Sequence, residues 1–173
     1  GSLRRKSLNT LLIRRLAEIT PENIDIELAK LHDIPFYDGD VESESGIPTS
    51  VEALRERIKA ADGLILAMPE YNGGMPGVLK NALDWLTRPP KEMGPTFAGR
   101  PLALAGATPG GLGTALAQAG SLTVLRQLKV RLFPDHLRIS SATDRLNEQG
   151  QPDEKLAKQL QRWLDGYIEF IQS

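Results

Sequence analysis

Residues 1–10 combine hydroxyl, amide and cationic side chains at the expected start of a helix. Backbone N–H groups and the positive end of the helix dipole favour an anion at such a place. Hydroxyl and amide donors beside one glycine suit a terminal phosphate monoester, and the Gly-Lys-Ser/Thr ending of a nucleoside triphosphate loop is absent. The simpler alternative is a helix cap beside a solvated basic patch. The residues that we expect to contact the phosphate are Ser2, Arg4, Ser7, Asn9 and Thr10.

A second loop, residues 69–77, follows a short apolar run and leads into an amphipathic pattern. Its glycines let the backbone approach the edge of a planar ring closely. The Asn72 side chain can donate and accept, which matches the alternating edge of a pyrimidine-like ring, and Tyr71 can pack beside that ring. We therefore expect a flavin here; the alternative is a strand-to-helix connection with incidental turn residues. The expected contacts are Pro69, Glu70, Tyr71, Asn72 and Gly73.

A third loop, residues 108–113, follows another apolar run and opens an alanine-rich helix pattern. Its glycines can line the same cleft from the other side, with Thr108, Gly110 and Gly111 as the expected contacts. Alone, Gly-Gly-Leu-Gly is a weak signal that is common in turns. The loop also lacks the Gly-x-Gly-x-x-Gly spacing and the later acidic residue of a dinucleotide fingerprint. We therefore expect no dedicated nicotinamide-dinucleotide domain.

The composition argues against several other classes of protein. A formal net charge of −1, from 21 basic and 22 acidic residues, gives no general attraction to nucleic acid. No apolar run approaches the roughly 20 residues of a membrane-spanning helix. The chain has no cysteine, which excludes disulfides and thiol nucleophiles and is compatible with the cytoplasmic location that we expect. His32 and His136 lie far apart, so we expect no metal site.

Apolar side chains alternate along the chain between helical and strand spacing. Helical patterns occupy residues 8–19, 49–61, 79–88, 114–128 and 156–171. Strand patterns occupy residues 24–28, 64–67, 101–105 and 130–133, with 137–139 as an extension. This order predicts an α/β fold, a doubly wound parallel sheet with helices on both faces. We expect one domain spanning residues 1–173.

The first residues of the chain resemble a loop that enters a helix, rather than a strand. A doubly wound sheet needs a strand directly before such a loop. We therefore expect that the first strand is missing from this sequence. The alternative is that Gly1 and Ser2 are a remnant of cloning and that the fold starts here.

With the three loops in view, the chain resembles the NADPH-dependent FMN reductase family, a flavodoxin-like group that includes quinone, azo-dye and chromate reductases. The resemblance rests on residues 1–4 with Ser7 and Asn9, on residues 69–72 followed by 77–85, and on residues 108–113. It implies the strand order 2-1-3-4-5 with the unseen strand at the centre. It also implies FMN as cofactor, NADPH or NADH as hydride donor, and a homodimer or homotetramer. Two departures are Gly74, where relatives often have serine, and the segment 114–116, which lacks a frequent arginine.

The resemblance implies an NAD(P)H oxidoreductase that passes hydride through N5 of FMN to quinones, free flavin or similar small acceptors in a ping-pong reaction. The cofactor carries the chemistry, so we expect no catalytic side chain. For Glu70 we expect a structural or subunit-interface role rather than a catalytic one. One alternative is a flavodoxin-type electron carrier, although the near-neutral charge and 5% aromatic content are not typical of such carriers. Another alternative is a flavin-free binding or regulatory domain of the same fold.

Overall fold

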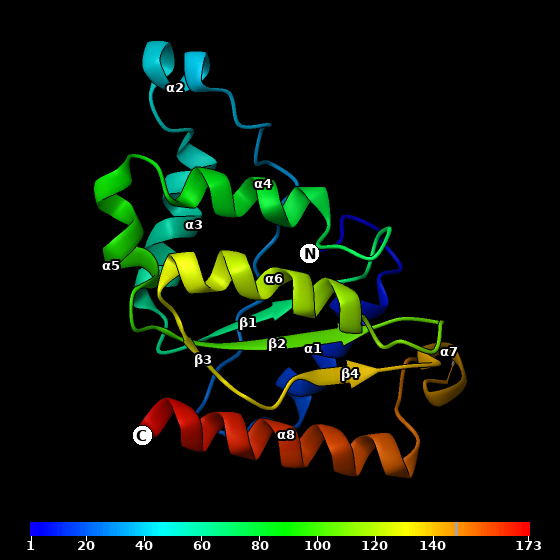
Figure 1. Cartoon of the computed structure of the whole chain (residues 1–173). Coiled ribbons are helices and arrows are strands. Elements are labelled where there is room, and N and C mark those ends of the chain that lie inside the picture. Colours follow the sequence, from blue (N-terminus) through cyan, green and yellow to red (C-terminus); the bar gives the residue numbers. More distant parts are fainter. Residues whose placement is uncertain (148) are drawn as a thin grey trace.

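The computed structural model describes residues 1–147 and 149–173, and its centre is a parallel sheet flanked by helices (Figure 1). The strands are β1 (Leu64–Ala67), β2 (Pro101–Ala107), β3 (Arg131–Leu132) and β4 (Leu137–Ile139). β2 pairs with β1 on one edge, and on the other edge it pairs first with β3 and then with β4. The helices are α1 (Leu8–Glu18), α2 (Gly39–Ser45), α3 (Thr49–Ala60), α4 (Gly77–Leu86), α5 (Met93–Phe97), α6 (Ala115–Leu128), α7 (Ala142–Arg145) and α8 (Glu154–Gln172), with a 3₁₀ turn at Pro90–Glu92.

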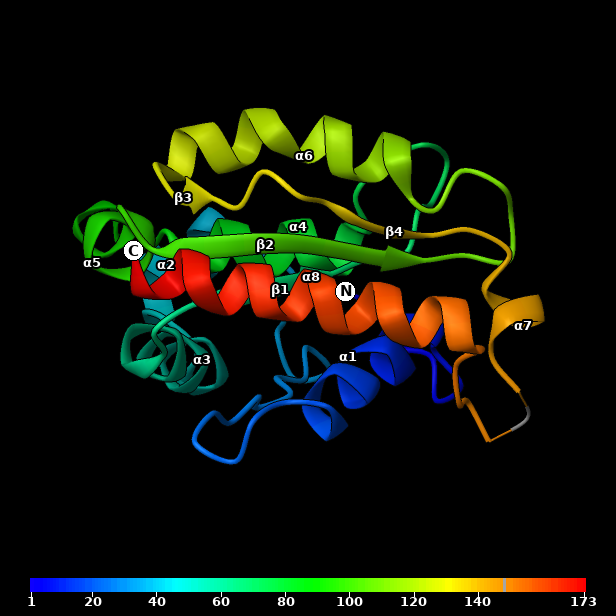
Figure 2. The same ribbon diagram turned by 90° about the horizontal axis from the view of Figure 1, so that it is seen from below.

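The side chains of β2 alternate between two hydrophobic cores, because successive residues of a strand point to opposite faces. Ala103 and Ala105 pack with α1 and α8, whereas Leu102 and Leu104 pack with α3, α4 and α6. Figure 2 shows α6 and α8 on opposite sides of β2. Both cores therefore meet at one central strand, as the expected helix-covered sheet requires.

Gly106 lets the chain fold back over the end of β2. A Cβ atom at this position would lie 1.7 Å from Oγ1 of Thr114, which is too close for any side chain. Thr114 itself is fully buried. The glycine therefore allows the loop after β2 to return across the strand and to begin α6 directly above it.

The structure confirms most of the expected elements and corrects one of them. The expected strand at residues 24–28 forms no ladder, although its alternation is real: Ile26 and Leu28 are partly buried against the α1 and α8 core, and Asp25 and Glu27 are exposed. The reason is that, among the described residues, no strand lies beside the free edge of β1 for this segment to pair with. The observed order β1, β2, then β3 and β4 matches the last three strands of the expected 2-1-3-4-5 sheet.

The short helices α2, α5 and α7 escape sequence prediction because they lack a long apolar stripe. In α2 no residue is buried, and the helix begins where the Asp38 carboxylate accepts a hydrogen bond of 2.9 Å from the Asp40 N–H. Figure 1 shows α2 projecting from the body of the molecule. A helix of this kind depends on its cap and not on core burial.

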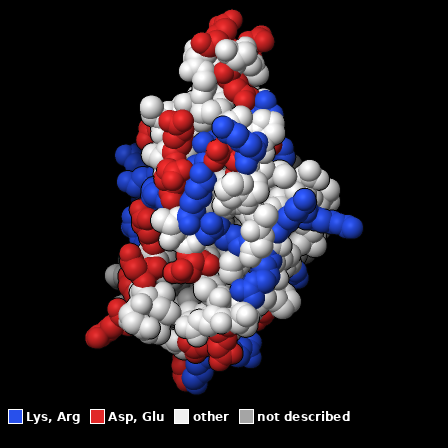
Figure 3. Space-filling model, turned by 90° about the vertical axis from the view of Figure 1, so that its left-hand side faces the viewer, with Lys and Arg blue, Asp and Glu red and all other residues white. Residues whose placement is uncertain are grey.

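Charges of both signs lie side by side on the face at the amino ends of the strands (Figure 3). The projecting α2 adds acidic side chains at the top of this view. This mixture agrees with the net charge of −1. Among the described residues, no helix combines the length and the apolar character needed to span a membrane.

Candidate functional site

The three loops selected from the sequence meet at the carboxyl edge of the sheet, on the right-hand side of Figure 1. Loop 1 (residues 1–10) lies beside β1, where the Gly1 nitrogen donates a hydrogen bond of 2.7 Å to the Ala67 carbonyl. Loop 2 (residues 69–77) follows β1, and loop 3 (residues 108–113) follows β2. Open α/β sheets bind ligands at this edge.

Loop 1 ends in a helix start that has open hydrogen-bond donors. Ser7 is the N-cap of α1, and its Oγ accepts from the Thr10 N–H at 3.2 Å. The amides of Leu8 and Asn9 have no hydrogen-bond partner in the described part of the chain. Residues 4–6, all cationic, are exposed next to them. The start of α1 therefore offers an anion both N–H donors and positive charge.

Asn9 has a role that the sequence does not reveal. It is buried, with 3% of its surface exposed. Its Nδ2 donates to the Ala107 carbonyl at 3.0 Å, and its Oδ1 accepts from the Ala107 N–H at 2.9 Å. Both ends of the amide thus hold α1 against the end of β2. The side chain of Asn9 is therefore a clamp between α1 and β2, whereas its backbone N–H stays open towards the site among the described residues.

Loop 2 forms a tight turn. Tyr71 and Gly74 exchange two backbone hydrogen bonds of 3.2 and 3.0 Å. Asn72 and Gly73 between them have φ angles of 52° and 70°, the left-handed pair of a type I′ turn. The Tyr71 side chain is 48% exposed. The turn therefore carries an aromatic ring and an amide outward at the site.

The Glu70 carboxylate is bound to another helix. Its Oε2 accepts hydrogen bonds from the backbone N–H groups of Leu116 at 2.9 Å and Ala117 at 3.0 Å, in the first turn of α6. The N-cap residue Thr114 makes no side-chain cap there. Glu70 therefore replaces the missing cap. This placement agrees with the structural role expected for Glu70, since the partners of Oε2 are two amides at a helix start.

Loop 3 is anchored at its start and open at its middle. The Thr108 N–H donates to the Ile139 carbonyl at 3.0 Å, and its Oγ1 accepts from the Gly110 N–H at 3.3 Å. Gly111 is exposed, and a Cβ atom built on it would meet no atom within 4 Å. No protein packing explains a glycine here, so the space beside Gly111 is free for a ligand.

The set of donors fits a ligand that has an anionic end and a flat ring. The open amides at the start of α1 suit the anion, and the Tyr71–Gly73 turn and the open space at Gly111 suit the ring. The described residues contain no group of three or more His, Asp or Glu side chains that could hold a metal ion.

Neither histidine belongs to the three loops. A ring nitrogen of His32, an exposed residue, lies 3.2 Å from the Leu3 carbonyl. His136 precedes β4 and contacts the Arg138 guanidinium at 3.3 Å. Burial, and then the charge of Arg138, lowers the pKa of His136. His136 is half-buried beside a cation and outside the three loops, so it is not part of the candidate site.

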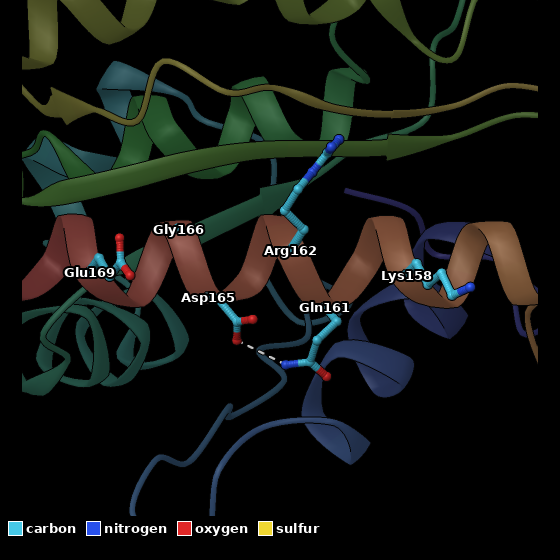
Figure 4. A pocket seen from close by; sticks show the side chains of 6 residues that line it. All are labelled: Lys158, Gln161, Arg162, Asp165, Gly166 and Glu169. Carbon is cyan, nitrogen blue, oxygen red and sulfur yellow. Dashed lines mark hydrogen bonds between the residues drawn. The ribbon is translucent and has the colours of Figure 1, made fainter.

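Two surface hollows lie elsewhere. One, of about 510 Å³, is lined by Lys158, Gln161, Arg162, Asp165, Gly166 and Glu169, all from α8 (Figure 4). Within it Gln161 donates to Asp165 at 2.9 Å. The other, of about 280 Å³, lies between residues 28–34 and α3. The first hollow runs along a single helix and so encloses no ligand from several sides, and neither hollow is lined by a residue of the three loops. The three loops therefore remain the candidate site.

Comparison with known proteins gives consistent matches. The family model described as NADPH-dependent FMN reductase matches residues 1–144. An NAD(P)H-dependent FMN reductase of Pseudomonas aeruginosa is 42% identical over 166 residues, which cover 95% of this chain and 88% of the relative. A 2-hydroxy-1,4-benzoquinone reductase of a Burkholderia species is 35% identical over 99% of this chain and 92% of its own length.

The structural match is equally broad. FerB, a flavoenzyme NAD(P)H:(acceptor) oxidoreductase from Paracoccus denitrificans, superimposes with a TM-score of 0.89 and 34% sequence identity. The alignment covers 99% of this chain and 93% of FerB. The flavodoxin-like α/β fold expected from the sequence is thereby confirmed.

Replacing Asn9 with Ala tests the clamp. The change leaves the N–H and C=O of Ala107 buried without partners, so we expect a loss of about 2–4 kcal/mol in the free energy of unfolding, measured by urea titration. Asn23→Ala is the matched control, because Asn23 is exposed and should change stability by less than about 0.5 kcal/mol. Equal effects of the two substitutions would contradict the clamp.

Proposed function

We propose, from the premise that this chain belongs to the NADPH-dependent FMN reductase family, that it uses FMN to oxidise NADPH or NADH and to reduce quinones, free flavin or similar small acceptors. One observation carries the proposal: three loops that suit a phosphate and a flat ring meet at one edge of the sheet, in a chain 42% identical to an FMN reductase.

In this proposal the phosphate of FMN binds at the start of α1, with the amides of Leu8 and Asn9 as donors. Ser7, already the helix cap, and the cations of residues 4–6 surround that end. Residues 69–73 of loop 2 and Thr108, Gly110 and Gly111 of loop 3 would hold the flavin ring. When bound, FMN would supply the hydride chemistry between the nicotinamide and the acceptor.

The protein contributes position. The two hydrogen bonds from Asn9 to Ala107 fix the start of α1 relative to loop 3. The exposed ring of Tyr71 would shield one side of the bound ligand from water. Loss of the Asn9 or Tyr71 side chain should therefore weaken FMN binding without abolishing hydride transfer, because neither side chain transfers a proton or forms a covalent bond in the proposed reaction.

We also propose a homodimer or homotetramer in the cytoplasm. Apolar side chains are exposed beside the site, with Leu112 at 59% and Leu116 at 51% exposure on loop 3 and the start of α6. Exposed apolar side chains that gather next to a ligand site are typical of interaction surfaces. The nicotinamide and the acceptor are the other expected partners, both small molecules.

An anaerobic assay tests the function. The purified chain is loaded with FMN, its visible spectrum is recorded, and NADPH or NADH is added before benzoquinone or free FMN. We expect bound FMN to bleach with the nucleotide alone and to recover its absorbance when benzoquinone is added. FMN that binds but is not bleached would favour an electron carrier. A chain that binds no FMN would favour a flavin-free domain.

Replacing Gly111 with Val tests the ring site. The new side chain meets open space in the protein alone, so the fold should persist while the side chain occupies the volume proposed for FMN. We expect at least about tenfold weaker FMN binding, or about 1.4 kcal/mol, by fluorescence titration. Gly94→Val in α5 is the control, since Gly94 also has no atom near its Cβ position. Unchanged affinity in Gly111→Val would place the ring elsewhere.

A further inference from the structure

Two helices, α1 and α6, begin at the same edge of the sheet, and they differ in whether the backbone N–H groups of their first turn have acceptors. All first-turn amides of α6 have acceptors: the Ala115 N–H donates to the Leu112 carbonyl and the Gln118 N–H to the Thr114 carbonyl, each at 3.0 Å. The two amides between them bind Glu70. At the start of α1 the amides of Leu8 and Asn9 are open in the described part of the chain.

This difference decides where an anion can bind. A helix start carries a partial positive charge and unpaired N–H groups. A carboxylate at this place neutralises the charge and accepts hydrogen bonds from the N–H groups. Glu70 does both at α6, so a phosphate would meet a negative charge and no free donor. At α1 the phosphate would meet open donors and the cations of residues 4–6.

Glu70 also joins two loops that are distant in sequence. The residues it binds are 46 and 47 positions further along the chain. The tip of the loop 2 turn also lies close to α6, because a Cβ atom at Gly73 would be 3.6 Å from Cδ1 of Leu116. The carboxylate thus holds loop 2 against the helix that loop 3 opens, and it sets the spacing between the two sides proposed for the ring.

We propose that Glu70 is a positioning residue for the reaction: by occupying the start of α6 it fixes loop 2 against the helix that follows loop 3 and directs the FMN phosphate to the start of α1. It thereby sets the direction in which the cofactor lies. The inference rests on the proposed function, but the anion preference of the two helix starts can be measured without FMN.

Two substitutions separate the charge of Glu70 from its hydrogen-bond geometry. Glu70→Gln keeps an acceptor oxygen for Leu116 and Ala117 and loses the charge. Glu70→Ala loses both, and it frees the two amides. Glu22→Ala is the control, because Glu22 is exposed and makes no hydrogen bond or ion pair in the described residues.

The first readout is NMR of the FMN-free proteins titrated with inorganic phosphate. In the parent chain and in Glu22→Ala we expect phosphate to shift the amide signals of Leu8 and Asn9 and to leave those of Leu116 and Ala117 unmoved. In Glu70→Ala the Leu116 and Ala117 signals should shift as well, and in Glu70→Gln they should shift less. Phosphate shifts at Leu116 and Ala117 in the parent chain, or their absence in Glu70→Ala, would overturn the proposal.

The second readout is the preference for FMN over riboflavin, which lacks the phosphate. We expect this affinity ratio to fall by about tenfold in Glu70→Ala and by less in Glu70→Gln, with no change in Glu22→Ala. An unchanged ratio in Glu70→Ala would contradict the positioning role. If the parent chain neither binds nor reduces FMN, the proposed function fails, and the phosphate titration still decides the role of Glu70.

Discussion

The first backbone N–H groups of a helix have no acceptor within the helix and need one from elsewhere. At the carboxyl edge of this sheet, this need determines how the loops are arranged. The start of α6 meets this demand inside the protein through Glu70, with bonds of 2.9 and 3.0 Å. The start of α1 meets it only in part, through Ser7. The first amides of α6 are therefore occupied, whereas, within the described residues, those of α1 are free to bind an anion. This asymmetry favours one orientation of a ligand such as FMN, with its phosphate at α1.

The asymmetry depends on a rigid base. β2 is buried along its length, and Asn9 holds α1 to its last residue through both ends of one side-chain amide. Gly106 brings Thr114 directly over the same strand. Loops 1 and 3 are thus fixed to the end of β2, and Glu70 then fixes loop 2 to the helix that follows loop 3.

The sequence predicts the parts of this arrangement that depend on local patterns. The apolar runs of β1 and β2, the stripe of α8 and the Tyr71–Gly73 turn are visible as runs, periodicity and turn residues. The partners of Asn9 and Glu70 are not visible, because they lie 98 and 46 residues away and are backbone atoms of any residue type. The alternation at residues 24–28 predicts burial correctly but not a ladder, since a ladder also needs a neighbouring strand.

A crystal structure of the chain with FMN tests the central claim most directly. The account predicts the phosphate on the amides of Leu8 and Asn9, the ring along Tyr71–Gly73 with Gly111 opposite, and the Glu70 carboxylate still on the amides of Leu116 and Ala117. A phosphate bound at the start of α6, or a ring outside the three loops, would contradict it.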